Sequence, residues 1–311
     1  MSFSENLLQL KKQAMAQAGP MFAHIDSIAE ANTLKVLDAM RECQVSEAHF
    51  NTTSGYAYDD IGRSKIEELF AKVFGAERAL VRTNFVSGTH ALATVLFGIL
   101  RPGDKLVSIT GAPYDTMQTV IGYANESPGS LKEFGVLYDE LEMIDGKVDM
   151  AGIAGKITPD TKMVLIQRSR GYSMRNPLTI EEIGAICQEV KKVKPDCICF
   201  VDNCYGEFVD TQEPVQAGAD IMAGSLIKNP GGGVALTGGY IAGKSDLVEL
   251  CSYRLTAPGM GDELGASLAN NRMIFQGFFL APHVVAQAIK GAVFAAALFA
   301  LLGYKTLPLP T

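Results

Sequence analysis

The sequence predicts an α/β fold in which a mainly parallel sheet of seven strands lies between helices. Two observations support this fold class. From about residue 79, short apolar runs alternate with segments of helical periodicity, which is typical of βαβ units. Most of these runs are apolar throughout rather than alternating, as expected of strands that are buried on both faces of a sheet.

The strands and one helix can be assigned to definite segments. We expect the strands at residues 79–81, 106–109, 135–138, 163–166, 197–201, 221–227 and 239–242. The clearest helix between them begins after Thr179, which forms a capping box with Glu182. Its apolar residues recur at helical spacing as far as Val190, so one face should pack on the sheet.

The first fifty residues are predicted to be helical. Ser27 and Glu30 form a capping-box pattern, which predicts that a helix begins there. Residues 51–62 form a loop rich in Gly, Ser, Thr, Tyr and Asp. A second capping-box pattern, Ser64 with Glu67, then predicts the start of an amphipathic helix.

The longest apolar stretch, residues 291–303, has 13 residues. A membrane-spanning helix needs ~20, so we interpret this stretch as a buried helix. Because so apolar a helix needs a surface to pack against, it predicts either oligomeric contacts or a missing C-terminal piece.

Charge, cysteine content and the N-terminus narrow the function classes. The formal net charge of −7 argues against a nucleic-acid-binding surface. The six cysteines have no spacing typical of a zinc site or a redox pair, so neither a metal nor a disulfide framework is expected. The first residues lack the pattern of a signal peptide. These features predict a cytoplasmic protein that binds neither nucleic acid nor a membrane.

Polar residues gather where the predicted strands end, and ligands of open α/β sheets bind at that edge. Ser87, Gly88 and Thr89 follow the first strand and would open the next helix, so their backbone N–H groups could face an anion. An ordinary helix cap explains them as well. Tyr114 follows the second strand and could lay its ring on a planar ligand, although a simple turn tyrosine also fits.

Two charged residues end apolar strands. Asp202 would place a carboxylate at the functional edge of the sheet, where burial raises its pKa unless a cation or hydrogen-bond donors hold it ionised. Lys228 precedes a glycine-rich turn, and burial would lower its pKa and make it a nucleophilic amine. The alternatives are an aspartate that caps a helix and a solvated lysine. An anion cradle, a stacking ring, a carboxylate and an amine are together what pyridoxal 5′-phosphate (PLP) requires.

Several longer runs carry a family resemblance, chiefly "VDNCYGEF" and "AGSLIKNPGGG", with "GYAYDDIGR", "FVSGTHA", "PYDT", "QRSRGYS" and "YRLTAPG". The chain resembles fold-type I PLP enzymes of the Cys/Met-metabolism group. More closely, it resembles the aluminium-resistance or methionine γ-lyase-like family, from about residue 50 to 305. The resemblance implies a PLP-dependent transferase-like fold whose large PLP-binding domain covers 51–285. An N-terminal helical segment, residues 1–50, precedes this large domain, and residues 286–311 form the start of a truncated C-terminal domain.

The resemblance also implies a role for each candidate residue. Lys228 would form a Schiff base with PLP and later move the Cα proton of the substrate, and Asp202 would pair with the pyridinium nitrogen. Tyr114 would stack on the ring and protonate a leaving thiolate. The implied phosphate ligands are Ser87, Gly88, Thr89 and Ser225. The candidates for reaching the phosphate of a partner subunit are Tyr58 and Arg63.

The activity that the resemblance implies is that of a PLP-dependent carbon–sulfur lyase, similar to cystathionine β-lyase or methionine γ-lyase. Such an enzyme acts on a sulfur-containing amino acid by β- or γ-elimination, here as a homodimer or homotetramer. Two alternatives remain open: a PLP-binding protein without turnover, because the C-terminal domain is missing, and a PLP enzyme of another reaction type, such as an aminotransferase. A nucleotide-binding enzyme that uses glycines 231–233 ranks lower, because its glycines follow the lysine instead of preceding it.

Overall fold

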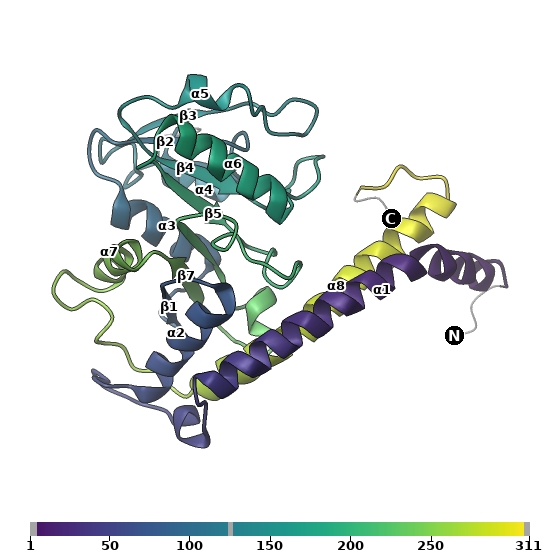
Figure 1. Cartoon of the computed structure of the whole chain (residues 1–311), viewed down its shortest axis with the longest axis horizontal. Helices are drawn as coiled ribbons and strands as arrows, with labels where there is room; N and C mark the ends of the chain where they lie inside the picture. Colours follow the sequence, from purple (N-terminus) through teal and green to yellow (C-terminus); the bar gives the residue numbers. More distant parts are fainter. Residues whose placement is uncertain (1–4, 124–126, 308–311) are drawn as a thin grey trace.

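The computed structural model describes residues 5–123 and 127–307 (Figure 1). Seven strands form one sheet in the order β1-β7-β6-β5-β4-β2-β3. All seven predicted strands are confirmed, with ends that differ by at most two residues. The strands are β1 (Arg78–Arg82), β2 (Lys105–Ser108), β3 (Leu137–Glu140), β4 (Thr161–Gln167), β5 (Ile198–Asp202), β6 (Ile221–Ser225) and β7 (Gly239–Gly243).

The direction of β7 makes the sheet mixed. This strand is antiparallel to both of its neighbours, β1 and β6, whereas the other four neighbouring pairs are parallel. The expectation of a mainly parallel sheet therefore holds for four of the six pairs. Since β1 and β6 both oppose β7, they run parallel to each other, and their carboxyl ends lie at the same edge as that of β5.

Helices cover both faces of the sheet. One face packs on α2 (Ile61–Phe74), α6 (Ile180–Val193) and part of α8 (Asn271–Leu301), and the other on α3 (Gly88–Ile99), α4 (Asp115–Ile121) and α7 (Ser245–Leu255). Alternate strand residues serve the two cores: Val107 and Val164 face the first, Leu106 and Leu165 the second. Because both faces are buried, the strands have the uniformly apolar character seen in the sequence. The short helices are α5 (Ile153–Lys156), η1 (Glu47–Phe50) and η2 (Asn229–Gly231).

The predicted helix starts are confirmed at one position and wrong at two. Thr179 caps α6, since its side chain accepts the N–H of Glu182 and the carboxylate of Glu182 accepts the N–H of Thr179. In contrast, α2 begins three residues before Ser64 because Asp60 is its N-cap and accepts the N–H of Arg63. Ser27 lies inside a continuous helix, where its hydroxyl donates to the carbonyl of His24 at 2.7 Å.

Two long helices form an arm that extends beyond the sheet (Figure 1). The first, α1 (Glu5–Glu42), runs beside α8, and together they bury a small cluster made of Ala18, Ile25, Ala286 and Val293. The predicted domain boundary at residue 285 falls inside α8, and the division into domains stays a prediction. Residues 1–4 and 308–311 of the predicted terminal segments lie outside the described residues.

The interpretation of residues 291–303 as a buried helix is wrong in two respects: the helix is longer, and much of it is not buried. Residues 291–301 are the last part of α8, which has 31 residues, and residues 302–303 lie in the turn after it. In the most apolar 18-residue window of α8, 28% is buried. Among the described residues, α8 is the one helix that is long and apolar enough to cross a membrane. Helix α1 covers one face of α8, where Ala286 and Val293 are buried.

Candidate active site

One cavity of about 490 Å³ opens where β1, β5 and β6 end. It brings together seven of the nine residues that the sequence nominated: Ser87, Gly88, Thr89, Tyr114, Asp202, Ser225 and Lys228. We call it the sheet-edge cavity. These residues come from four separate stretches of the chain, so the strand topology alone brings them to one place.

The wall formed by the start of α3 has the features of an anion cradle. Ser87 is the N-cap of this helix, and its Oγ accepts the N–H of His90 at 3.1 Å. The next residue, Gly88, leaves this space open, because a Cβ atom there would lie 3.1 Å from the Cβ of Ser225, closer than most such contacts. The Oγ of Ser225 is buried and has no hydrogen-bond partner among the described residues. Since such a group is destabilising by ~1–3 kcal/mol, it indicates a position where a ligand supplies the missing partner.

Tyr114 lies at the N-terminus of α4 and is held at both ends. Its backbone N–H donates to the Oε1 of Gln167 at 3.0 Å, and its hydroxyl lies 3.1 Å from the Oγ1 of Thr89. Burial raises the pKa of Tyr114. The phenol therefore keeps its proton at neutral pH and can donate it to an atom in the cavity.

Asp202, the last residue of β5, is buried at the floor of the cavity. Its Oδ1 accepts the N–H of Cys204 at 3.0 Å. Burial raises the pKa of this carboxyl group, as the sequence predicted. A cation placed beside Asp202 would therefore favour its ionised form, which fits a protonated ring nitrogen.

Lys228 reaches into the same cavity from the turn after β6. Its Nζ lies 4.1 Å from the centroid of the Tyr205 ring. The expectation that its pKa is lowered is wrong: burial does lower the pKa of Lys228, but Cys204, Tyr205 and Asp202 raise it, and the net pKa lies above the ordinary value. The amine is therefore an ammonium at neutral pH and must lose a proton before it can act as a nucleophile.

Tyr58 and Arg63 lie outside this cavity. The ring of Tyr58 is exposed beside that of Tyr56, with the ring centroids 6.3 Å apart. Arg63 is buried, and its guanidinium donates to the backbone carbonyls of Ala57, Gly265 and Glu263 at 2.7–3.0 Å. Arg63 thus connects two loops of its own chain, and the role of both residues at the phosphate of a partner stays a prediction.

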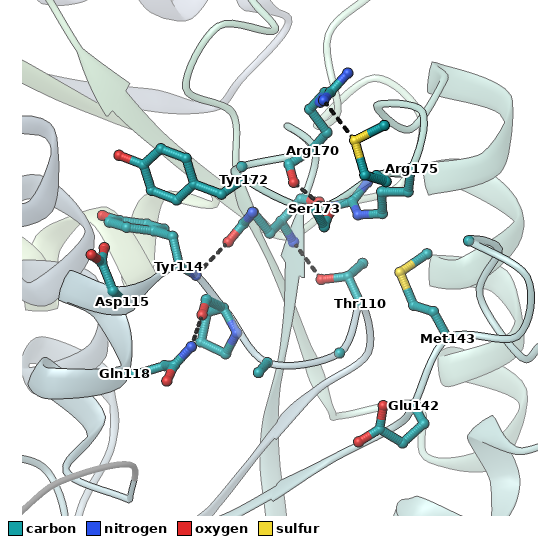
Figure 2. A pocket seen from close by; sticks show the side chains of 17 residues that line it. Thr110, Tyr114, Asp115, Gln118, Glu142, Met143, Arg170, Tyr172, Ser173 and Arg175 are labelled. Atoms are coloured by element: carbon teal, nitrogen blue, oxygen red, sulfur yellow. Dashed lines mark hydrogen bonds between the residues drawn. The ribbon is translucent and has the colours of Figure 1, made fainter. Parts of the chain in front are cut away.

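A second pocket of about 460 Å³ adjoins the sheet-edge cavity (Figure 2). Tyr114 and Tyr172 lie on one side of it, and Met143 and Arg175 lie on the other. Four residues line both spaces, namely Tyr114, Asp115, Gly171 and Tyr172. The two spaces are therefore neighbours that share these four residues as a wall.

Sequence reasoning gave no role to several residues that line the cavity. They are Asp115, Thr116, Ser169, Gly171, Tyr172, Cys204, Tyr205 and Ile227. Most follow directly from the ends of β4 and β5, inside the runs "QRSRGYS" and "VDNCYGEF". Their position directly after a strand could have identified them as cavity residues, because the carboxyl ends of parallel strands meet at one edge of the sheet.

Fold and site together define an α/β protein with a ligand site at the carboxyl edge of its sheet, where a lysine, a buried aspartate and an anion cradle meet. Comparison with known proteins places it more narrowly. The family model described as methionine gamma-lyase matches residues 7–311. The chain belongs to this family, whose members are carbon–sulfur lyase-like proteins.

Individual relatives agree with this assignment. The uncharacterised protein YnbB of Bacillus subtilis is 50% identical over 304 residues, which are 96% of this chain and 72% of YnbB. A crystal structure of a carbon–sulfur lyase involved in aluminium resistance, from Clostridium novyi, is 47% identical with a TM-score of 0.96, over 99% of this chain and 74% of that one. The PLP-dependent protein YhfS of Escherichia coli has a TM-score of 0.64 at 17% identity, over 89% of this chain and 70% of that one, which shows a shared fold alone.

Proposed function

We propose that this chain binds PLP in the sheet-edge cavity and acts as a lyase that cleaves the carbon–sulfur bond of an amino acid by β- or γ-elimination. The observation that carries the proposal is the arrangement of the cavity. It holds a lysine amine, a buried carboxyl group and a buried hydroxyl that has no partner among the described residues, all at the same edge of the sheet. The residues present fit the groups of PLP: an aldehyde, a ring nitrogen and a phosphate.

The phosphate would lie at the start of α3. There the N-terminus of a 12-residue helix offers free N–H groups and a favourable dipole. The hydroxyl of Ser225 would donate to the phosphate and so gain a partner, which it lacks within residues 5–123 and 127–307. The absence of a Cβ on Gly88 keeps this space open, since a larger residue would meet Ser225 and Cys204.

PLP, when bound, supplies an electron sink that stabilises negative charge at the Cα of an attached amino acid. Asp202 would keep the ring nitrogen protonated, because a cation beside a buried carboxylate stabilises its ionised form. Lys228 would hold the aldehyde of the cofactor and would move the Cα proton of the substrate. Tyr114 holds a proton next to the cavity and donates it to the sulfur that leaves.

The test has two stages, of which the first concerns the cofactor. The purified chain is mixed with PLP, reduced with borohydride and digested, and the modified lysine is located by mass spectrometry. We expect absorbance in the visible range and a modification at Lys228 that Lys228→Ala removes. Modification at a different lysine, or no visible band, contradicts the cofactor assignment.

The second stage tests the reaction. Cystathionine, methionine and cysteine are supplied in turn to the PLP-loaded chain, and keto acid and thiol are measured. Release of both products in equal amounts supports the lyase. Keto acid without thiol, formed together with the aminated cofactor, indicates a transaminase. PLP binding without either product indicates a protein that holds the cofactor but does not turn over these substrates.

A further inference from the structure

The Lys228 amine has two close neighbours to which the proposed function gives no role. Its Nζ lies 4.1 Å from the centroid of the Tyr205 ring, within the range of a cation–π contact. The buried side chain of Cys204 lines the same cavity and contributes to the raised pKa of the amine. Burial raises the pKa of the Cys204 thiol well above its ordinary value, so this thiol is neutral and its sulfur can accept from the ammonium.

Tyr205 adopts a backbone conformation that a tyrosine rarely has. Its φ is +69°, in the left-handed region that favours glycine. Such a residue persists only where its surroundings fix it. Here the N–H of Gly206 donates to the carbonyl of Asn203 at 2.8 Å, and Arg168 donates to the carbonyl of Gly206 at 2.9 Å. Burial of the ring does not explain the conformation, because Tyr205 is 62% exposed. What the conformation does achieve is to bring the ring next to Lys228.

The position of Cys204 is also fixed by its neighbours. Its N–H donates to Asp202, and its side chain is buried, with the Sγ 3.3 Å from the position that a Cβ on Gly88 would occupy. The turn that carries the lysine is tied to the same loop, since the side-chain amide of Asn229 donates to the carbonyl of Glu207 at 2.9 Å. The contacts of the amine therefore come from parts of the chain that are joined by hydrogen bonds.

We propose that Cys204 and Tyr205 form a dock for the Lys228 amine, which holds it as an ammonium inside the cavity until an aldehyde arrives. Both are positioning residues, since they act through Lys228. The proposal rests on the proposed function, because it assumes that Lys228 is the residue that captures the aldehyde. The titratable groups that face the amine are Asp202, Cys204 and Tyr205.

The dock has a chemical consequence. When the amine captures an aldehyde, its nitrogen lone pair forms the new C–N bond, the carbonyl oxygen leaves as water, and the ammonium proton has first passed to solvent. A ring and a thiol that favour the ammonium therefore reduce the fraction of reactive amine at neutral pH. An exposed cation–π contact changes such an equilibrium about two- to fivefold. Loss of the ring should lower the midpoint of amine titration by ~0.4–0.7 pH unit.

The experiment measures the amine directly, without cofactor or turnover. The full chain is freed of bound aldehyde with hydroxylamine and dialysed, then labelled with trace acetic anhydride at a series of pH values. Labelling of Lys228 is followed by peptide mass spectrometry, with an exposed lysine peptide as the internal standard. Tyr205→Gly removes the ring and suits the positive φ, whereas the matched variant Tyr205→Phe keeps the ring. Cys204→Ala and Cys204→Ser form the second pair.

We expect Tyr205→Phe, which keeps the ring, to titrate closer to the unmodified chain than Tyr205→Gly does. Tyr205→Gly should titrate at a lower pH, with about two- to fivefold more labelling at neutral pH. We also expect Cys204→Ala to shift in the same direction and Cys204→Ser to shift less. If Tyr205→Gly and Cys204→Ala both keep the original midpoint while far-UV circular dichroism shows native helix content, the dock is refuted. An equal shift in Tyr205→Phe would also refute the role of the ring.

These outcomes are separate from those of the proposed function. If borohydride traps PLP at Lys228 but the pH midpoint of Lys228 labelling is the same in the Tyr205 and Cys204 variants, only the dock is refuted. The dock can equally be measured in a chain that releases neither keto acid nor thiol.

Discussion

Glu207 offers the sharpest test of the electrostatics beneath the site. Its side chain is fully buried, with Oε1 accepting the hydroxyl of Tyr240 at 2.8 Å and Oε2 without a partner among the described residues. Burial raises the pKa of Glu207 to about 8. The folded chain therefore holds a proton that the unfolded chain releases above its ordinary pKa of 4.5. The stabilisation from this protonated group is complete below pH 4.5 and is lost as the pH rises to 8.

The variant Glu207→Gln is neutral at every pH, so it lacks this loss. A shift of about 3.5 pH units at ~1.4 kcal/mol each gives an upper value of ~5 kcal/mol. We expect the free energy of unfolding of the variant, minus that of the original chain, to grow towards this value between pH 5 and 8. Urea unfolding followed by circular dichroism at each pH measures it.

The size of this difference at any single pH is not informative, because the new amide adds its own unpaired groups. Only its change with pH tests the reasoning. The exposed Glu142→Gln controls for the removal of one carboxylate. A pKa shift of one unit corresponds to ~1.4 kcal/mol. If the difference in free energy of unfolding between Glu207→Gln and the original chain changes by less than this between pH 5 and 8, the pKa of Glu207 is not strongly raised.

Three further predictions concern the cavity and its frame. Ser225→Ala should stabilise the PLP-free chain by ~1 kcal/mol, since it removes a buried hydroxyl that has no partner in the described part of the chain. The same change should weaken PLP binding ~10-fold or more, so stability in urea should rise while PLP affinity falls. Asp202→Asn should reduce turnover at least ~10-fold more than it reduces PLP affinity, because one pKa unit of lost coupling at the ring nitrogen is worth ~1.4 kcal/mol; equal losses in the two assays would contradict this role. Gly232→Ala should lower the urea midpoint, since Gly232 has a φ of +55° and its new Cβ would meet the carbonyl of Gly277; an unchanged midpoint would show that the turn can relax.

Much of the site could be predicted from the sequence because strand ends carry a strong signal. A run of buried apolar residues that stops at Asp202 or just before Lys228 identifies both the strand and the edge where ligands bind. The capping box at Thr179 is equally local, since its two hydrogen bonds join residues three apart. These features depend on short stretches of chain, and the sequence alone determined them.

Other features required the tertiary structure. Ser64 has a capping pattern as good as that of Thr179, but Asp60 starts the helix earlier. The loop before it is fixed by hydrogen bonds between its own Thr53 and Ser267, which is distant in the chain. The reversed direction of β7 was invisible, since a strand buried on both faces has the same composition either way.

The net pKa of Lys228 also depends on the tertiary structure, which is why the sequence-based expectation for it was wrong. The sequence predicts that burial lowers the pKa of this amine, and burial does so, but the net pKa depends on the groups beside it. Asp202, Cys204 and Tyr205 lie more than twenty residues away in the chain and reach the amine because β5 and β6 are neighbours in the sheet. The sequence by itself determined which residues stand at the strand ends. Only the tertiary structure decided which of them touch, because contact depends on strand order and direction, which local sequence patterns do not specify.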